Sequence, residues 1–223
     1  MKCKFCGYEW KPRKPKPVAC PRCKRRFDYP LKKAEEDLIT KAKNIERGFQ
    51  RTIYVMSVLT PRLEERGVKA VVVGGAAVEF YTRDWYATGD IDLAVNKGKR
   101  KELGKVLEVM GLKKMGRMWV REDLGLYIEA PGDIADIAID KITRIETDAG
   151  FAYVIGLEDI IFDRTQAAEH WKSESDKEQA IRIGAMFYDD IDWKYLCSKC
   201  TEEGSKKMLR KVKEAAKDAK ERT

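Results

Sequence analysis

The sequence predicts a mixed α/β (α+β) fold: a mixed sheet with flanking helices, a cysteine-rich N-terminal module and a helical C-terminal region. An apolar run at 71–73 ends in Gly-Gly and is followed at 90–95 by alternating acidic and apolar residues, which is typical of strands. Several other segments repeat apolar residues every three or four positions, which is typical of helices. We expect the boundaries 1–29 (N-terminal module), 30–66 (linking helix), 67–156 (core) and 157–223 (helical region).

The N-terminal module carries two Cys-x2-Cys pairs, formed by Cys3, Cys6, Cys20 and Cys23. Two such pairs supply the four thiolates of a tetrahedral structural zinc site. About thirty residues bury too little apolar surface to fold by themselves, so a metal is the expected stabiliser. The segment resembles a zinc ribbon. Its basic and aromatic side chains favour single-stranded RNA or DNA as a partner, with a solubilising and stabilising cap as the alternative.

A linking helix should follow, because apolar residues recur at helical spacing from Leu38 to Met56. Gly48 would weaken its middle by about 1 kcal/mol relative to alanine. Thr60 and Pro61 predict the N-cap and first turn of a second, short helix that closes at Gly67.

The segment 71–95 carries the residues with the clearest chemistry. Gly74 and Gly75 end a buried strand in a tight turn, where backbone N–H groups can approach a phosphate. Asp90 and Asp92 are two residues apart on a second strand, so both side chains project from the same face. Paired carboxylates repel each other unless a cation neutralises them, which predicts a Mg²⁺ site.

A third carboxylate is expected on a later hairpin. Residues 117–121 and 126–130 alternate apolar and polar residues around a turn at 122–125. Glu129 is the best candidate on the second strand. Asp133 and Asp136 are rivals, but Pro131-Gly132 should end the strand before them.

The remaining chain predicts further elements of the same two kinds. Helices are expected at 97–110, from 157 towards Trp171, and throughout 177–223; a hairpin is expected across 142–155. Cys197 and Cys200 would share a helix face as a buried thiol pair or a disulfide rather than as a metal site.

These residues together resemble the polymerase-β-like nucleotidyltransferase superfamily. The flanking detail is similar to minimal bacterial and archaeal nucleotidyltransferases, some of which are toxins or abortive-infection proteins. The matching positions are Gly74 to Ala77, Arg83, Thr88 and the run from Asp90 to Leu93. Fourteen residues separate Gly75 from Asp90, about one more than the family usually has, so the loop carrying Arg83 is expected to be reshaped.

The resemblance implies transfer of a nucleoside monophosphate from an NTP to an acceptor hydroxyl, with Mg²⁺ as cofactor. It implies that Asp90, Asp92 and Glu129 are the catalytic and magnesium-binding residues. It also implies nucleotide-binding roles for Gly74, Gly75, Arg83 and Thr88. The family often has a helix that starts with acidic residues and carries a basic residue about one turn later, and Arg164 matches that basic position. The resemblance implies that Arg164 contacts the triphosphate, and an ordinary surface arginine is the alternative.

The distribution of charge along the chain favours one class of acceptor, and the composition favours one cellular source. Residues 1–33 hold 12 Lys or Arg against two acids and residues 205–223 hold eight against three, while the whole chain is +8. These basic ends favour RNA bound through the zinc ribbon and the C-terminal helix, and the resemblance to toxin relatives implies a tRNA 3′ end. No membrane span or signal peptide is expected. The charge-rich composition resembles hyperthermophile proteins and favours an archaeal, cytoplasmic source.

Three alternatives stay open. One is a protein AMP-transferase acting on a protein partner, and another is a catalytically weak nucleotide- or RNA-binding module. The third is a solvated acidic strand edge without function, which leaves Gly74, Gly75 and Glu129 unexplained together.

Overall fold

The computed structural model describes residues 1–3, 7–12, 17, 19–22, 38–83 and 85–222. A seven-stranded sheet with the order β3-β4-β5-β2-β1-β7-β6 forms its centre. The strands are β1 (Ala70–Val73), β2 (Ile91–Val95), β3 (Lys113–Met115), β4 (Met118–Arg121), β5 (Leu126–Asp133), β6 (Thr143–Thr147) and β7 (Gly150–Val154). The β1/β7 and β2/β5 pairs are parallel and the others antiparallel, so the predicted mixed sheet is confirmed.

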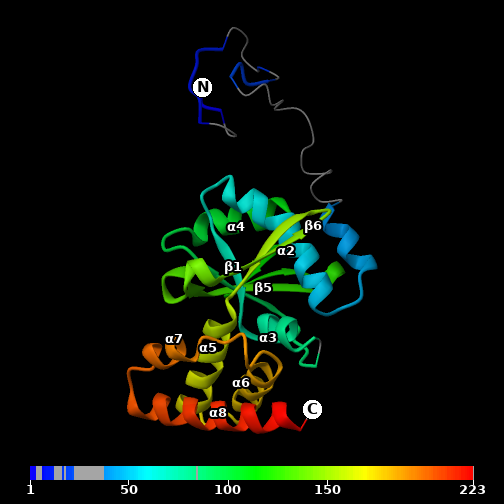
Figure 1. Ribbon diagram of the computed structural model, residues 1–223. Helices are drawn as coiled ribbons and strands as arrows, with labels where there is room; N and C mark the ends of the chain where they lie inside the picture. Colours follow the sequence, from blue (N-terminus) through cyan, green and yellow to red (C-terminus); the bar gives the residue numbers. More distant parts are fainter. Residues whose placement is uncertain (4–6, 13–16, 18, 23–37, 84, 223) are drawn as a thin grey trace.

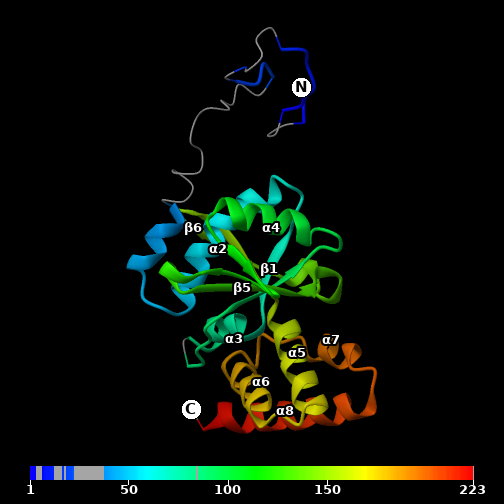
Figure 2. The same cartoon turned by 180° about the vertical axis from the view of Figure 1, so that it is seen from behind.

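Helices lie on both sides of this sheet (Figures 1 and 2). On one side lie α2 (Phe49–Glu64) and α4 (Arg100–Val109). On the other lie α3 (Gly74–Thr82) and the C-terminal helices. Ile91 and Leu93 of β2 are 4% and 0% exposed, so these apolar side chains enter the core as predicted, while alternation turns their acidic neighbours away from it.

The linking segment differs from its prediction. A short 3-10 turn η1 (Lys41–Asn44) precedes α2, and Gly48, with φ +133°, stands at the N-cap of α2 rather than in the middle of a helix. The second helix predicted at Thr60 is wrong, because α2 continues through Pro61 to Glu64. Burial of Val58, Leu59 and Leu63 holds this last turn against the core despite the missing proline N–H.

The predicted hairpin at 117–130 is confirmed as β4 and β5, joined by a 3-10 turn η2 (Glu122–Leu124). The expected strand break at Pro131 is wrong, because β5 continues to Asp133. A register shift between Asp92 and Ala94 of β2 accommodates the proline, which lacks a ladder N–H. Gly132 then pairs with Ala94, where an added Cβ would lie 3.1 Å from the alanine side chain.

The C-terminal region is helical, as predicted. It comprises α5 (Leu157–His170), α6 (Glu174–Met186), α7 (Trp193–Lys199) and α8 (Glu203–Glu221). Side chains of Ser173 and Asp192 accept backbone N–H groups at the starts of α6 and α7, which explains where these helices begin. In the described residues, no helix is long and apolar enough to cross a bilayer.

Candidate active site

Strand register brings the predicted catalytic carboxylates together. Asp92 of β2 lies opposite Val73 of β1 on one side and Glu129 of β5 on the other. Asp90 comes directly before β2, one residue outside the strand that was predicted to carry it. Burial, followed by the negative charges of Asp90 and Glu129, raises the pKa of Asp92. The three carboxylates therefore repel each other across neighbouring strands, and this repulsion is what a divalent cation would relieve.

The described residues hold no set of three metal-ligating side chains already close enough to enclose an ion. Glu129 faces Arg117 instead, with Arg117 Nε 3.3 Å from Glu129 Oε1. The arginine side chain is 88% exposed and the glutamate 16%, so solvent screens this pair and it contributes little stability. The oxygen donors of Asp90, Asp92 and Glu129 suit Mg²⁺, which would supply the counter-charge that Arg117 supplies here.

Asp90 is oriented by a neighbouring hydroxyl. Thr88 Oγ1 donates a 2.9 Å hydrogen bond to Asp90 Oδ1. The same threonine lies against Gly75, where an added Cβ would lie 3.2 Å from the Thr88 side chain. Thr88, predicted to bind nucleotide, is thus placed between the glycine turn and the first carboxylate.

Two independent constraints require glycine at position 74. Its φ of +60° lies in the left-handed region that L side chains rarely adopt. A Cβ added there would lie 2.5 Å from Asp92 Oδ2, well inside contact distance. Glycine therefore lets the chain turn from β1 into α3 with its backbone against the second carboxylate.

A cavity of about 370 Å³ opens beside Gly74 and Asp92, between the sheet and α5. Five carboxylates belong to its lining: Asp92, Asp133, Asp136, Asp159 and Asp163. Two cations also line it, Arg164 and Lys199. Asp133 and Asp136, the rivals of Glu129, lie here beyond the Asp92–Glu129 pair, and Asp133 also accepts the backbone N–H of Ala135.

The two arginines predicted to bind nucleotide have different positions. Arg164 lines the cavity, 18% exposed, with Nη1 2.7 Å from Asp176 Oδ1 and its guanidinium also bonded to Asp163. Its charge opposes the rise in the pKa of Asp92, so it acts on the site electrostatically. Arg83 is exposed at the far end of α3, about 13 Å along the helix from Gly74, and it is not in the lining.

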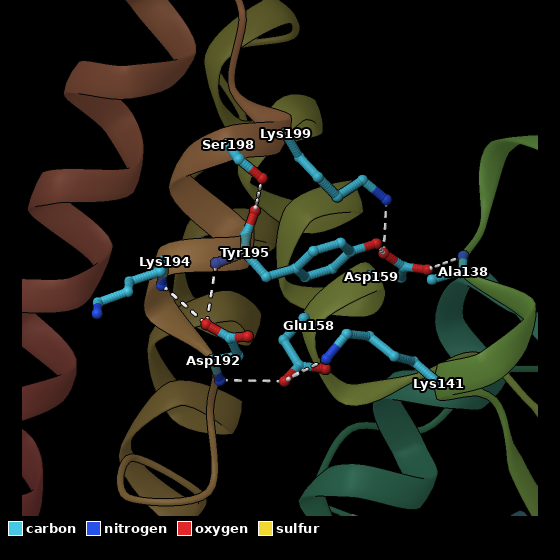
Figure 3. Close-up of polar contacts among 9 residues, drawn as sticks. All are labelled: Ala138, Lys141, Glu158, Asp159, Asp192, Lys194, Tyr195, Ser198 and Lys199. Carbon is cyan, nitrogen blue, oxygen red and sulfur yellow. Dashed lines mark hydrogen bonds and ion pairs between the residues drawn. The ribbon is translucent and has the colours of Figure 1, made fainter.

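A polar cluster at the start of α5 joins the cavity to the helical region (Figure 3). Asp159 Oδ1 accepts bonds from Lys199 Nζ at 2.5 Å and from the Tyr195 hydroxyl at 3.0 Å. Its other oxygen accepts the backbone N–H of Ala138. Burial, and then the hydrogen bond to Asp159, raise the pKa of Tyr195 to about 12, so this phenol stays a donor.

The neighbouring Glu158 makes a second set of contacts in the same view. Its Oε1 accepts the backbone N–H of Asp192 and lies 3.6 Å from Lys141 Nζ. Since Asp192 also caps α7, Glu158 fixes where that helix starts. Asp159 and Lys199 were not predicted to belong to the site. The acidic pair that opens α5 is a local signal for Asp159, but Lys199 lies forty residues further along the chain.

Two of the four N-terminal cysteines, Cys3 and Cys20, belong to the described residues. Cys3 and Cys20 are 2% and 1% exposed. The Gly7 N–H donates to the Cys3 carbonyl at 3.0 Å, and Gly7 has a φ of +71°. Cys6 and Cys23 lie outside the described residues, and no metal-ligating cluster is present among those described.

Comparison with known proteins gives one family match and several similar structures. Residues 51–102 match a family model described as a nucleotidyl transferase of unknown function (DUF2204). An antigenic nucleotidyltransferase-like protein from Paracoccidioides brasiliensis aligns structurally with a TM-score of 0.56 and 15% identity, covering 80% of this chain and 90% of that chain. The fold is nucleotidyltransferase-like. The segment that matches the family model contains α3, Asp90 and Asp92.

Two structures of the antibiotic-resistance factor ANT(2″)-Ia are also similar. The solution structure aligns with a TM-score of 0.42 at 14% identity, covering 84% of this chain and 94% of that chain. The crystal structure in complex with adenylyl-2″-tobramycin aligns with a TM-score of 0.40 at 16% identity, covering 74% and 94%. No curated protein sequence matches the chain.

Proposed function

We propose that this protein is a magnesium-dependent nucleotidyltransferase that moves an NMP from an NTP to an acceptor hydroxyl. The observation that supports it most is the register of β1, β2 and β5, which sets Asp92 between the Gly74 turn and Glu129. Asp90, Asp92 and Glu129 would hold Mg²⁺, which supplies charge neutralisation to a transferring phosphoryl group when bound.

The chain's own groups have complementary tasks in this reaction. Backbone N–H groups at Gly74 and Gly75 cradle the β and γ phosphates. Glu129 accepts the proton of the acceptor hydroxyl. The oxygen of that hydroxyl forms the new bond to the α-phosphorus. The bond from that phosphorus to the bridging oxygen breaks, and pyrophosphate leaves with the electron pair.

We consider two classes of acceptor, RNA and a small hydroxyl compound. RNA is favoured by the basic residues of α8, of which Lys206, Lys207 and Lys211 are exposed. A small hydroxyl acceptor is favoured by the volume of the cavity, about 370 Å³, which lies in the range of small-molecule sites. The acceptor is therefore decided by where label from the donor appears.

The transferase itself is tested by incubating the protein with each α-³²P-labelled NTP, Mg²⁺, total RNA and a small-molecule extract. We expect label on RNA or on an extracted small molecule with the wild type, and none with the Asp90→Ala, Asp92→Ala double variant. Label that is equal with both proteins, or absent for all four NTPs with a folded wild type, contradicts the proposal.

We also propose that the N-terminal module binds a structural zinc ion through Cys3, Cys6, Cys20 and Cys23. The near-complete burial of Cys3 and Cys20 in so short a segment supports it. Atomic emission should find about one zinc ion per chain in the wild type and a loss of most of it in Cys3→Ser and Cys20→Ser. Cys197→Ser, which removes an exposed thiol in α7, is the control and should keep its zinc.

A further inference from the structure

Lys199 brings a positive charge from the helical region into the catalytic cavity. It is the last residue of α7, and it lines the same cavity as Asp92 and Gly74. Leu196 and Cys200, 0% and 3% exposed, anchor the chain on either side of it. The backbone of Lys199 therefore has a defined position beside the cavity.

The cavity offers few cations for a polyanionic substrate. Arg164 is held by two carboxylates, Asp163 and Asp176. Lys199 is paired with one carboxylate in the described residues, Asp159, and its side chain is 18% exposed. Of the two cations in the lining, Lys199 is thus the less neutralised, because one carboxylate faces it and two face Arg164.

Aromatic rings and a buried carboxylate hold the ammonium without enclosing it. Lys199 Nζ lies 4.9 Å from the ring centroid of Phe162, which lines the cavity, and 5.6 Å from that of Tyr195. Asp159 is itself 1% exposed and also accepts bonds from Tyr195 and Ala138. Asp159 consequently keeps two hydrogen-bond donors if Lys199 turns part of its charge toward a ligand.

We propose that Lys199 is a substrate-binding residue that contacts the phosphates of the NTP donor and links α7 to the reaction at β2. This inference rests on the proposed function and extends it to the helical region. A purely structural Lys199 would neutralise Asp159 and nothing more. The two roles differ in one measurable respect: only direct contact lets a bound triphosphate shield the Lys199 amine from a chemical reagent. Either role makes triphosphate binding depend on the charge of Lys199, because its loss leaves Asp159 unneutralised in the same lining.

The test measures binding of Mg-tripolyphosphate, of each Mg-NTP and of each NMP to the full chain by calorimetry. Lys199→Met should weaken the triphosphate ligands about 10- to 100-fold, the range for one hydrogen bond to a charged group, and leave the monophosphates unchanged. Lys199→Arg should restore most of the affinity. In turnover assays the loss should fall mainly on KM for the NTP.

Lys194→Met is the matched control, because Lys194 is exposed on the same helix and points away from Asp159 (Figure 3). Amine acetylation of the wild type separates direct contact from loss of the counter-charge of Asp159, and it remains available if Lys199→Met unfolds: Mg-tripolyphosphate should protect Lys199 and not Lys194. Equal triphosphate affinity in Lys199→Met and wild type, or no protection, overturns the inference while wild-type turnover leaves the proposed function intact. A folded wild type that binds no NTP overturns both.

Discussion

An Asp92→Asn protein is expected to lose NMP transfer by about a thousandfold or more, while its metal-free form melts at a higher temperature than the wild type. Activity falls because an amide is a poor Mg²⁺ ligand and cannot neutralise a divalent ion, whose contribution is several kcal/mol. Stability rises because the folded chain no longer holds a partly buried carboxylate against Asp90 and Glu129. Labelled transfer and thermal melting measure the two effects.

The size of the stability gain depends on pH. Since the pKa of Asp92 in the fold lies above its ordinary value of 3.8, the folded state binds a proton more tightly than the unfolded state. The destabilisation is thus absent below the unfolded pKa, develops as the pH rises through the folded pKa, and is complete above it. The difference in melting temperature should be larger at pH 7 than at pH 4 and should vanish below the unfolded pKa.

Two controls accompany Asp92→Asn. Asp136→Asn removes the same charge from an exposed position in the cavity lining and should keep transfer and melting temperature near wild type. Added Mg²⁺ should raise the melting temperature of the wild type and not that of Asp92→Asn. A metal-free Asp92→Asn that melts below the wild type at pH 7 would refute the crowding of carboxylates described here.

Gly74→Ala is expected to reduce transfer about a hundredfold, the loss typical of reacting groups displaced by about 1 Å. The new Cβ would lie 2.5 Å from Asp92 Oδ2, so the carboxylate or the turn must move. The positive φ adds a backbone penalty of about 1–2 kcal/mol in the free energy of unfolding. Steady-state kinetics and denaturant unfolding separate these two consequences.

Gly98→Ala isolates the backbone penalty. Gly98 also has a positive φ, +77°, but nothing lies within 4 Å of an added Cβ. It should therefore lose stability by a similar amount and retain transfer. If Gly74→Ala transfers within a factor of about two of Gly98→Ala, the close approach of Gly74 to Asp92 has no catalytic role.

Local pattern predicted most of the elements around the site. The alternation in 90–95 turns Ile91 and Leu93 into the core, and the Glu122–Leu124 turn joins two strands where the polar run predicted it. These features depend on side-chain period and turn chemistry, which are properties of a few neighbouring residues. Two predictions based on proline are wrong: a new helix at Pro61 and a strand end at Pro131. The packing of α2 and a register shift in β5 override the tendency of proline to interrupt helices and strands.

The sequence by itself determined that Gly74, Asp90 and Asp92 belong to one short stretch with phosphate and metal chemistry, because their spacing sets their relative orientation on a strand and a turn. The tertiary structure alone decided the rest. It chose Glu129 over Asp133 as the neighbour of Asp92 through the pairing of β2 with β5. It placed Arg83 outside the cavity lining and Lys199 within it. The reason is that strand register and the docking of α7 on α5 arise from burial summed over many residues, which no local spacing encodes.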